Sequence, residues 1–375
     1  MFLALRELKH SKLRYFLIGA IMMLIAWLVF LLSGLANGLS SDNGSALKYM
    51  NADSVVFQKD VRLFLHRSIL PMEKVDDITE ITGVNNAAPL GQLTVTSENI
   101  NDSSQIDATI LAIDPKSFLA PKIIDGIGLD EADSNSIVVN DSFKRHGVEI
   151  GDKLKITPSE KEFTVVGFTT RQTYNHLPVI FMHIPQWQEL KFALPGSNAN
   201  IENPISGIAV QVSDDALLEE VNTEIEKTIT DVEVATRQVA LENLPGYKEE
   251  MGTITMMLVF LFIIASFVIA VFLYVITLQK TNQFGVLKAI GAKNSFLAKN
   301  LIGQVFILSV FSIFIGVLLT YGVAAIIPPE VPFSLDTSLV VIYSFVLLAV
   351  SLLGSLLSLR RIAKIDALEA IGRAD

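Results

Sequence analysis

Oxygen- and sulfur-bearing side chains gather in one short stretch near position 250. The stretch contains Tyr247, Glu249, Glu250 and Met251, followed by Met256 and Met257 one to two helical turns further along. Tyr247 lies three residues from Glu250 and four from Met251, so these three side chains share one face of a helix. Phenol, carboxylate and thioether groups can ligate metals such as iron. The same residue types also serve as plain membrane-interface anchors and gap-filling core residues.

Other kinds of chemistry find no support in the sequence. The chain has no Cys, which excludes disulfides, thiolate metal sites and thiol nucleophiles. None of the five His residues has the i, i+4 spacing of a metal pair, and we interpret them as surface or structural: His10, His66, His146, His176 and His183. No G-x-S-x-G turn nominates a catalytic serine. No G-x-x-x-x-G-K-[S/T] loop is present to hold nucleotide phosphates.

Four uncharged apolar runs set the architecture, each longer than the roughly 20 residues that cross a bilayer core. They are Tyr15–Ser41, Met251–Gln279, Asn300–Pro329 and Thr337–Leu359. The first run follows a basic start and could be a secretory signal. Because it far exceeds the about 7–15 apolar residues of a cleaved signal, we interpret it as a membrane helix.

Charge predicts which side each loop occupies. Twelve of the 29 Lys and Arg residues lie in three short segments at the ends of the apolar runs, within residues 6–14, 280–299 and 360–373. Residues 42–250 hold 33 Asp and Glu against 17 Lys and Arg, a net charge of −16. Short loops rich in Lys and Arg stay in the cytoplasm. We therefore expect a cell-membrane protein with both termini inside, an acidic domain outside, and no nucleic-acid partner.

These observations predict the following domains. They are a cytoplasmic amphipathic helix over 1–12, transmembrane helices over 13–41, 249–280, 299–328 and 338–360, an extracytoplasmic domain over 42–248, a cytoplasmic loop over 281–298, an extracytoplasmic loop over 329–337 and a cytoplasmic tail over 361–375. Gly34 and Gly38 lie on one face of the first helix, where small residues allow close helix approach.

The outer domain has the pattern of a mixed α/β fold. Runs rich in β-branched residues and flanked by turn residues predict strands at Ser54–Phe57, Leu93–Thr96, Ala108–Ile113, Ser136–Val139, Leu154–Ile156, Phe163–Phe168 and Ile208–Val212. Helices are predicted at Pro185–Leu190 and Asp214–Thr230. In the second helix, Asp214 or Asp215 could cap an apolar stripe of Leu217, Leu218, Val221 and Ile225.

The cytoplasmic segment 279–293 is the most distinctive stretch. Apolar Phe284, Val286, Leu287 and Ile290 alternate with Lys and Gln before a stop at Gly291, as in a short interfacial helix. Its pattern Gln-Lys-x-x-x-Phe-Gly-Val-Leu-Lys-Ala-Ile-Gly-Ala resembles the intracellular loop of the permeases grouped with MacB and FtsX. Residues 365–372 resemble the closing signature of the same family, with Ala367 where the family usually has Pro.

This resemblance covers the chain from end to end and carries its own expectations. It implies a MacB-like exporter fold, with four transmembrane α-helices arranged one plus three around a large extracytoplasmic α/β domain. It also implies a non-catalytic permease that works as a homodimer with a separate ABC ATPase subunit, which binds ATP and Mg. The residues expected to contact that ATPase are Phe284, Gly285, Val286, Leu287, Lys288, Ala289, Ile290 and Gly291.

Three further segments are similar to the haem-exporting members of this family in Gram-positive bacteria: 33–39, 272–280 and 332–335. The resemblance thus implies haem as the transported ligand, with no intrinsic cofactor. No apolar run contains His, so the expected haem-binding residues are Tyr247, Glu249, Glu250, Met251, Met256 and Met257. Glu249, Glu250 and Met251 are the candidate iron ligands. Two alternatives stay open: an exporter of antimicrobial peptides or lipopeptides, and an FtsX-like regulator of a cell-wall hydrolase that transports nothing.

Overall fold

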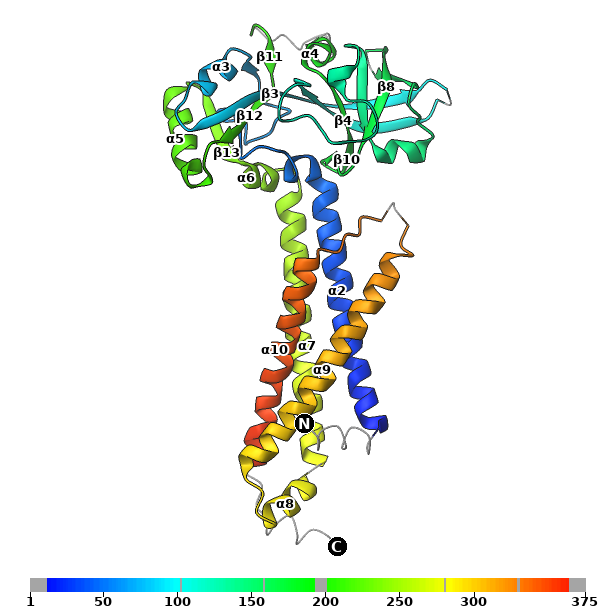
Figure 1. Cartoon of the computed structure of the whole chain (residues 1–375), viewed down its shortest axis with the longest axis vertical. Helices are drawn as coiled ribbons and strands as arrows, with labels where there is room; N and C mark the ends of the chain where they lie inside the picture. The colour runs from blue at the N-terminus through cyan, green and yellow to red at the C-terminus, as the bar shows by residue number, and fades with distance from the viewer. Residues whose placement is uncertain are drawn as a thin grey trace. The chain divides into compact units, whose positions relative to one another are not determined.

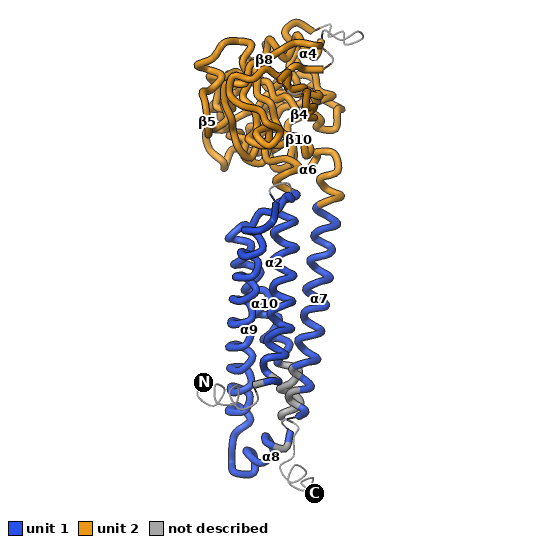
Figure 2. Tube along the Cα trace, turned by 90° about the vertical axis from the view of Figure 1, so that its right-hand side faces the viewer, with its two compact units in different colours: residues 1–39, 251–375 blue, residues 40–250 orange. Residues whose placement is uncertain are grey.

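The computed structural model describes residues 12–101, 103–157, 159–192, 201–279, 281–328 and 331–363 (Figure 1). The chain divides into two compact units, shown in Figure 2: residues 1–39 with 251–375, and residues 40–250. We call these the membrane unit and the outer unit. The predicted helix over 1–12 falls almost entirely outside the described residues, as does the tail beyond Ala363 and with it the closing signature at 365–372.

The membrane unit is helical. Its helices are α2 (Lys12–Lys48), α7 (Tyr247–Gln279), α8 (Thr281–Ala289), α9 (Asn294–Ala324) and α10 (Thr337–Ala363). All but α8 are long and apolar enough to cross a membrane, which confirms the predicted four spans in one-plus-three order. Helix α2 continues past its predicted limit to Lys48, with a kink at Gly44, where the backbone is not helical.

Helices α2 and α9 pack through small residues. A Cβ added at Gly19 would lie 3.1 Å from Leu308, and one at Gly316 would lie 3.1 Å from Ala26. The Ser312 hydroxyl donates to the Gly19 carbonyl at 3.0 Å. Close backbone approach of this kind is how helices associate in lipid, where no hydrophobic driving force acts between them.

The predicted role of Gly34 and Gly38 needs correction. Both glycines do mark a close approach, but to the segment linking α9 and α10 and not to another helix. A Cβ at Gly34 would overlap the Phe333 ring, and one at Gly38 would overlap the Pro332 backbone. The Ser334 amide donates to the Gly34 carbonyl at 3.0 Å, and the Asn37 side chain donates to the Ser334 carbonyl at 3.1 Å. We call residues 331–336 the docked loop.

The outer unit is built on one large mixed sheet. Its strands are β1 (Ser54–Gln58), β3 (Val84–Asn99), β4 (Gln105–Ile113), β5 (Ile123–Gly126), β6 (Ser136–Asn140), β7 (Lys153–Thr157), β8 (Lys161–Thr169), β9 (Thr173–Tyr174), β10 (Leu177–His183), β12 (Gly207–Val212) and β13 (Val232–Thr236). The two short strands β2 (Leu70–Pro71) and β11 (Pro204–Ile205) pair separately. All seven predicted strands lie within observed ones.

Six strands close into a ring. The main order is β13-β1-β12-β3-β4-β10-β6-β8-β5, and β7 pairs with both β3 and β8. The circuit β3-β4-β10-β6-β8-β7 therefore returns to β3. Strand β3 is long and also pairs with β12, so it belongs both to the ring and to the rest of the sheet. Because the ring is closed, none of its strands is left with an unpaired edge. Unpaired strand edges can pair with other chains and cause aggregation.

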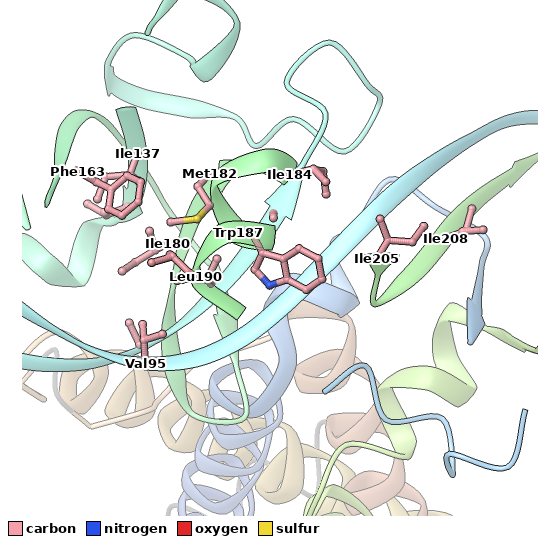
Figure 3. Packing of buried hydrophobic residues seen from close by; sticks show 14 of the residues in the cluster. Val95, Ile137, Phe163, Ile180, Met182, Ile184, Trp187, Leu190, Ile205 and Ile208 are labelled. Atoms are coloured by element: carbon pink, nitrogen blue, oxygen red, sulfur yellow. The ribbon is translucent and has the colours of Figure 1, made fainter. Parts of the chain in front are cut away.

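Helices cover the sheet and complete its core. They are α3 (Lys74–Thr79), α4 (Ile184–Phe192), α5 (Leu218–Thr228) and α6 (Arg237–Glu242), with 3-10 turns η1 (Leu129–Glu131), η2 (Asp141–His146) and η3 (Asp215–Leu217). Trp187 of α4 is fully buried among Ile180, Met182 and their neighbours (Figure 3). Its ring passes so close to Gly91 on β3 that a Cβ there would lie 2.6 Å away. Asp214 caps η3, with α5 following, as predicted.

Candidate functional sites

The start of α7 carries the first candidate site. Tyr247 is buried, and its hydroxyl lies 2.8 Å from the hydroxyl of Ser40 on α2. One turn later the Glu250 carboxylate accepts a hydrogen bond from the Asn43 side chain at 3.0 Å. Both predicted ligand residues thus already have partners within the outer unit.

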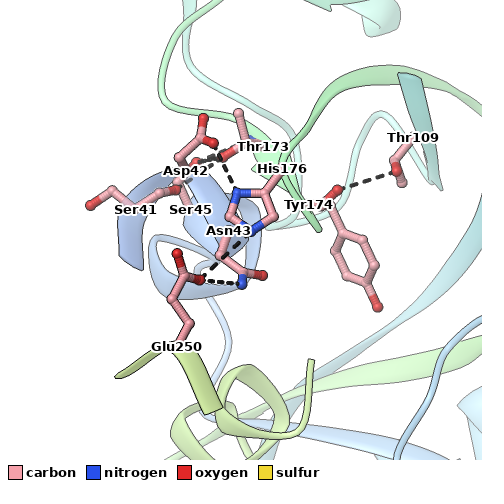
Figure 4. Close-up of polar contacts among 9 residues, drawn as sticks. All are labelled: Ser41, Asp42, Asn43, Ser45, Thr109, Thr173, Tyr174, His176 and Glu250. Carbon is pink, nitrogen blue, oxygen red and sulfur yellow. Dashed lines mark hydrogen bonds and ion pairs between the residues drawn. The ribbon is translucent and has the colours of Figure 1, made fainter. Parts of the chain in front are cut away.

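His176 joins the same group of polar side chains (Figure 4). Its Nδ1 lies 3.0 Å from the Asp42 carboxylate and its Nε2 lies 3.6 Å from that of Glu250. His176 occupies the turn between β9 and β10, where both Asn175 and His176 have left-handed backbone. We call Asp42, Asn43, His176 and Glu250 the helix-end cluster. It ties the end of α2, the start of α7 and the β9–β10 turn together by polar contacts.

Sequence reasoning missed this cluster. The exposed position of His176 and its contact with Asp42 agree with a surface or structural role, but the two residues are 134 positions apart, so no local spacing pairs them. A helix ending near Ser41 would also have left Asp42 and Asn43 in a loop. The available signal in the sequence is charge: in a domain with a net charge of −16, a carboxylate is a common partner for a histidine.

The remaining predicted ligand residues are spread along α7. Glu249 is exposed and Met251 is half-buried, while Met256 and Met257 keep about half of their side-chain surface exposed, at 54% and 49%. Across the described ranges, no group of three or more His, Asp or Glu residues is arranged to hold a metal ion. An iron atom carried by haem needs only one or two axial ligands from the protein. The haem site therefore stays a prediction.

The second candidate site is α8, the predicted ATPase-coupling segment. Phe284 is 2% exposed and packs with Leu297 and Leu301 of α9, with Leu287 and Ala292 against them. Gly285 is buried, whereas Val286, Ala289 and Ile290 are exposed. Gly291 ends the helix in the left-handed conformation, at φ +97°. The helix is thus anchored on one side and presents apolar side chains on the other.

A hollow adjoins this exposed face. It has a volume of about 610 Å³ and runs between α8 and the first turn of α9, lined by Leu287, Ile290, Gly291, Ala292, Lys293, Ser295, Phe296 and Lys299. Ile290 is 77% exposed and Phe296 is 50% exposed. Exposed apolar side chains rimmed by charge are typical of a protein-protein contact. Of the predicted coupling residues, Phe284 is the buried anchor, and Ile290 is more exposed than Val286, which is 52% exposed.

Comparison with known proteins gives matches at two levels. Residues 17–228 match the MacB-like periplasmic core domain, and residues 255–367 match the FtsX-like permease C-terminal region. A permease of Staphylococcus epidermidis, provisionally named HrtB of a hemin transport system, is 29% identical over 99% of both chains. An uncharacterized ABC transporter permease of Mycobacterium tuberculosis is 23% identical, again over 99% of both.

Solved structures give weaker similarity. The periplasmic region of MacB from Actinobacillus actinomycetemcomitans aligns at 12% identity with a TM-score of 0.36, covering 50% of this chain and 90% of that one. The extracellular domain of the transporter YknZ from Gram-positive bacteria aligns at 12% identity with a TM-score of 0.35, covering 49% of this chain and all of that one.

Proposed function

Because the chain belongs to the MacB-like and FtsX-like family of ABC transporter permeases, we propose that it is the permease subunit of an ATP-driven exporter that removes haem, or a similar amphipathic toxic molecule, from the membrane. The observation that carries this proposal is the full-length similarity to permeases named for hemin transport. The four spans and the two-unit architecture are consistent with it.

The proposal assigns a side of the membrane to each part. In this proposal α8 and both termini lie in the cytoplasm, because short segments rich in Lys and Arg stay on that side, and the acidic outer unit lies outside. Since no phosphate-binding loop occurs in the sequence, a separate ATPase subunit supplies the energy. Two copies of each subunit form a two-fold assembly with a self-complementary permease interface.

Coupling follows from the anchoring of α8. The buried Phe284 links α8 to α9, so displacement of α8 by the ATPase moves α9 with it. Helix α9 packs along α2 through Gly19 and Gly316, and this contact carries the movement to the first span. Haem enters laterally from the outer part of the bilayer and is expelled when the cleft between the two copies narrows.

The haem site rests on α7. Met256 and Met257 offer exposed thioethers, and Glu249 offers an exposed carboxylate at the start of the helix. Glu250 and Tyr247 contribute only if their hydrogen bonds to Asn43 and Ser40 open.

The test is a visible-absorbance titration of the detergent-solubilised permease with haem, followed by ATPase measurements on the complex with its partner. We expect a saturable Soret shift, at least tenfold weaker binding for Glu249→Ala combined with Glu250→Ala, and haem-stimulated ATP hydrolysis. Lys227→Ala, in the outer unit, serves as the control. Hydrolysis that responds to a lipopeptide but not to haem would overturn the haem assignment and leave the permease assignment standing.

A further inference from the structure

A cavity in the outer unit lies apart from both candidate sites. Its volume is about 380 Å³, within the size range of small-molecule sites. It is lined by His66, Gln92, Leu93, Thr94, Tyr174, Asn175, Lys191 and Pro245. All of these residues belong to one compact unit, so the cavity is formed without the membrane unit.

Lys191 supplies a cation without a counter-ion. Its ammonium group donates to the Ser206 hydroxyl at 3.1 Å and to the Gln92 backbone carbonyl at 3.4 Å, both neutral acceptors. Within the described ranges no Asp or Glu forms an ion pair with it, and the sequence has no acidic residue between Lys191 and Glu202. An ammonium group has three N–H donors, and the described residues use two of them.

The surroundings hold this ammonium in place. It lies 4.9 Å from the centre of the Trp187 ring, which is itself fixed in the core against Gly91. Burial lowers the pKa of Lys191 to about 8, since the site stabilises its charge poorly. A bound anion would supply the missing stabilisation.

The charges near the cavity differ from those of the acidic unit around it. Residues 42–250 carry a net charge of −16, yet the described residues that line the cavity include no carboxylate. His66 lies at the same cavity, and Arg67 is next to it in sequence. The pKa of His66 is lowered by burial and by the charges of Arg67 and Lys191. This concentration of positive potential favours a negatively charged group.

Gln92 adds a hydrogen-bonding group on the same wall. Its side chain is 2% exposed, its Nε2 donates to Thr94 at 3.3 Å, and its Oε1 has no partner within the described part of the chain. Because the Oε1 atom is itself buried, Gln92 forms part of the cavity wall, and the Lys191 ammonium is the group that meets an anion.

We propose that this cavity binds a small molecule that bears a carboxylate, with the carboxylate on Lys191 and the apolar part against Leu93 and Pro245. None of these residues belongs to the predicted haem site on α7. The proposal therefore does not depend on haem being the transported substrate.

The experiment uses the full-length protein in detergent and benzoate as the probe, with benzamide as the uncharged control. Calorimetry at pH 8 in two buffers of different ionisation enthalpy measures affinity and proton uptake together. We expect benzamide to bind at least tenfold more weakly than benzoate. Benzoate binding should also take up protons, because the bound anion raises the pKa of Lys191.

Matched variants separate the site from non-specific effects. Lys191→Met should lower benzoate affinity at least tenfold and abolish proton uptake, while Lys227→Met, at an exposed lysine of the same unit, should change neither. If Lys191→Met does not fold, acetylation of Lys191 in the native protein provides the second measurement, and benzoate should slow it where benzamide does not. Equal effects of benzoate and benzamide would overturn the proposal. Displacement of benzoate by equimolar inorganic phosphate would overturn the choice of a carboxylate.

Discussion

At the residue scale, the protein depends on how its partly buried polar groups are paired. Their spacing makes Tyr247 and Glu250 candidate haem-binding residues, but each has a hydrogen-bond partner on α2. Lys191 shows the opposite case, a cation surrounded by neutral acceptors and aromatic rings. A buried charge without a counter-charge costs free energy unless something compensates it.

The pH dependence of stability tests this account of Lys191. Its pKa falls from 10.5 in the unfolded chain to about 8 in the fold, so the cost of burying the charge is fully present below pH 8 and disappears as pH rises toward 10.5. The wild type should therefore gain up to about 3 kcal/mol between these limits relative to Lys191→Met. Thermal unfolding of both chains at pH 7.5 and near pH 10 measures the difference, and parallel curves would contradict it.

At the element scale, the main finding is the docked loop on α2. Residues 332–334 pack against Gly34, Asn37 and Gly38 of α2, although the two segments lie about three hundred positions apart in sequence. The loop packs against the helix so tightly that only glycine fits at position 38. The connection between α9 and α10 is thereby fixed to the first span.

Replacing Gly38 by Ala should destabilise the membrane unit, because the new methyl group would overlap the Pro332 backbone. Gly303→Ala is the matched control: this glycine also lies inside a long helix, in α9, and nothing lies within 4 Å of an added Cβ. Alanine favours the helix by roughly 1 kcal/mol over glycine, so the control should be neutral or stabilising. Thermal unfolding in detergent should therefore shift in opposite directions, and equal shifts would exclude the docked loop.

Helix α8 makes a separate prediction. Ile290→Glu should leave thermal stability unchanged, because the side chain is 77% exposed, yet reduce partner-dependent ATP hydrolysis at least tenfold by placing a charge on an apolar contact. Leu217→Glu, at an exposed position of the outer unit, should leave hydrolysis unaffected. Normal ATPase activity of the Ile290 variant would show that the exposed face of α8 does not contact the ATPase subunit.

Sequence patterns predicted elements better than they predicted contacts. The apolar runs specified the four spans, and β-branched enrichment located strands such as β4 and β8, because both signals are local. Strand β10 was missed, since Pro178 and His183 interrupt its pattern while pairing with β4 and β6 stabilises it. The helix-end cluster and the docked loop join residues more than one hundred positions apart, and no local signal encodes such contacts.

At the scale of the whole molecule, charge and apolar helices are distributed unequally between the two units. The outer unit carries −16 and the remainder of the chain +6, and the four apolar helices all belong wholly or mainly to the membrane unit. This distribution favours one insertion direction, with the basic segments inside. Both the proposed ATPase contact at α8 and the proposed export direction require that orientation.

The most direct test of this account is the side of the membrane on which α8 lies. Because the chain has no Cys, single cysteines at Ser295 and Lys227 can be labelled in cells with a membrane-impermeant maleimide. The account predicts that Lys227→Cys is labelled in intact cells and Ser295→Cys only after permeabilisation. Labelling of Ser295→Cys in intact cells would place the proposed coupling helix outside and contradict the account.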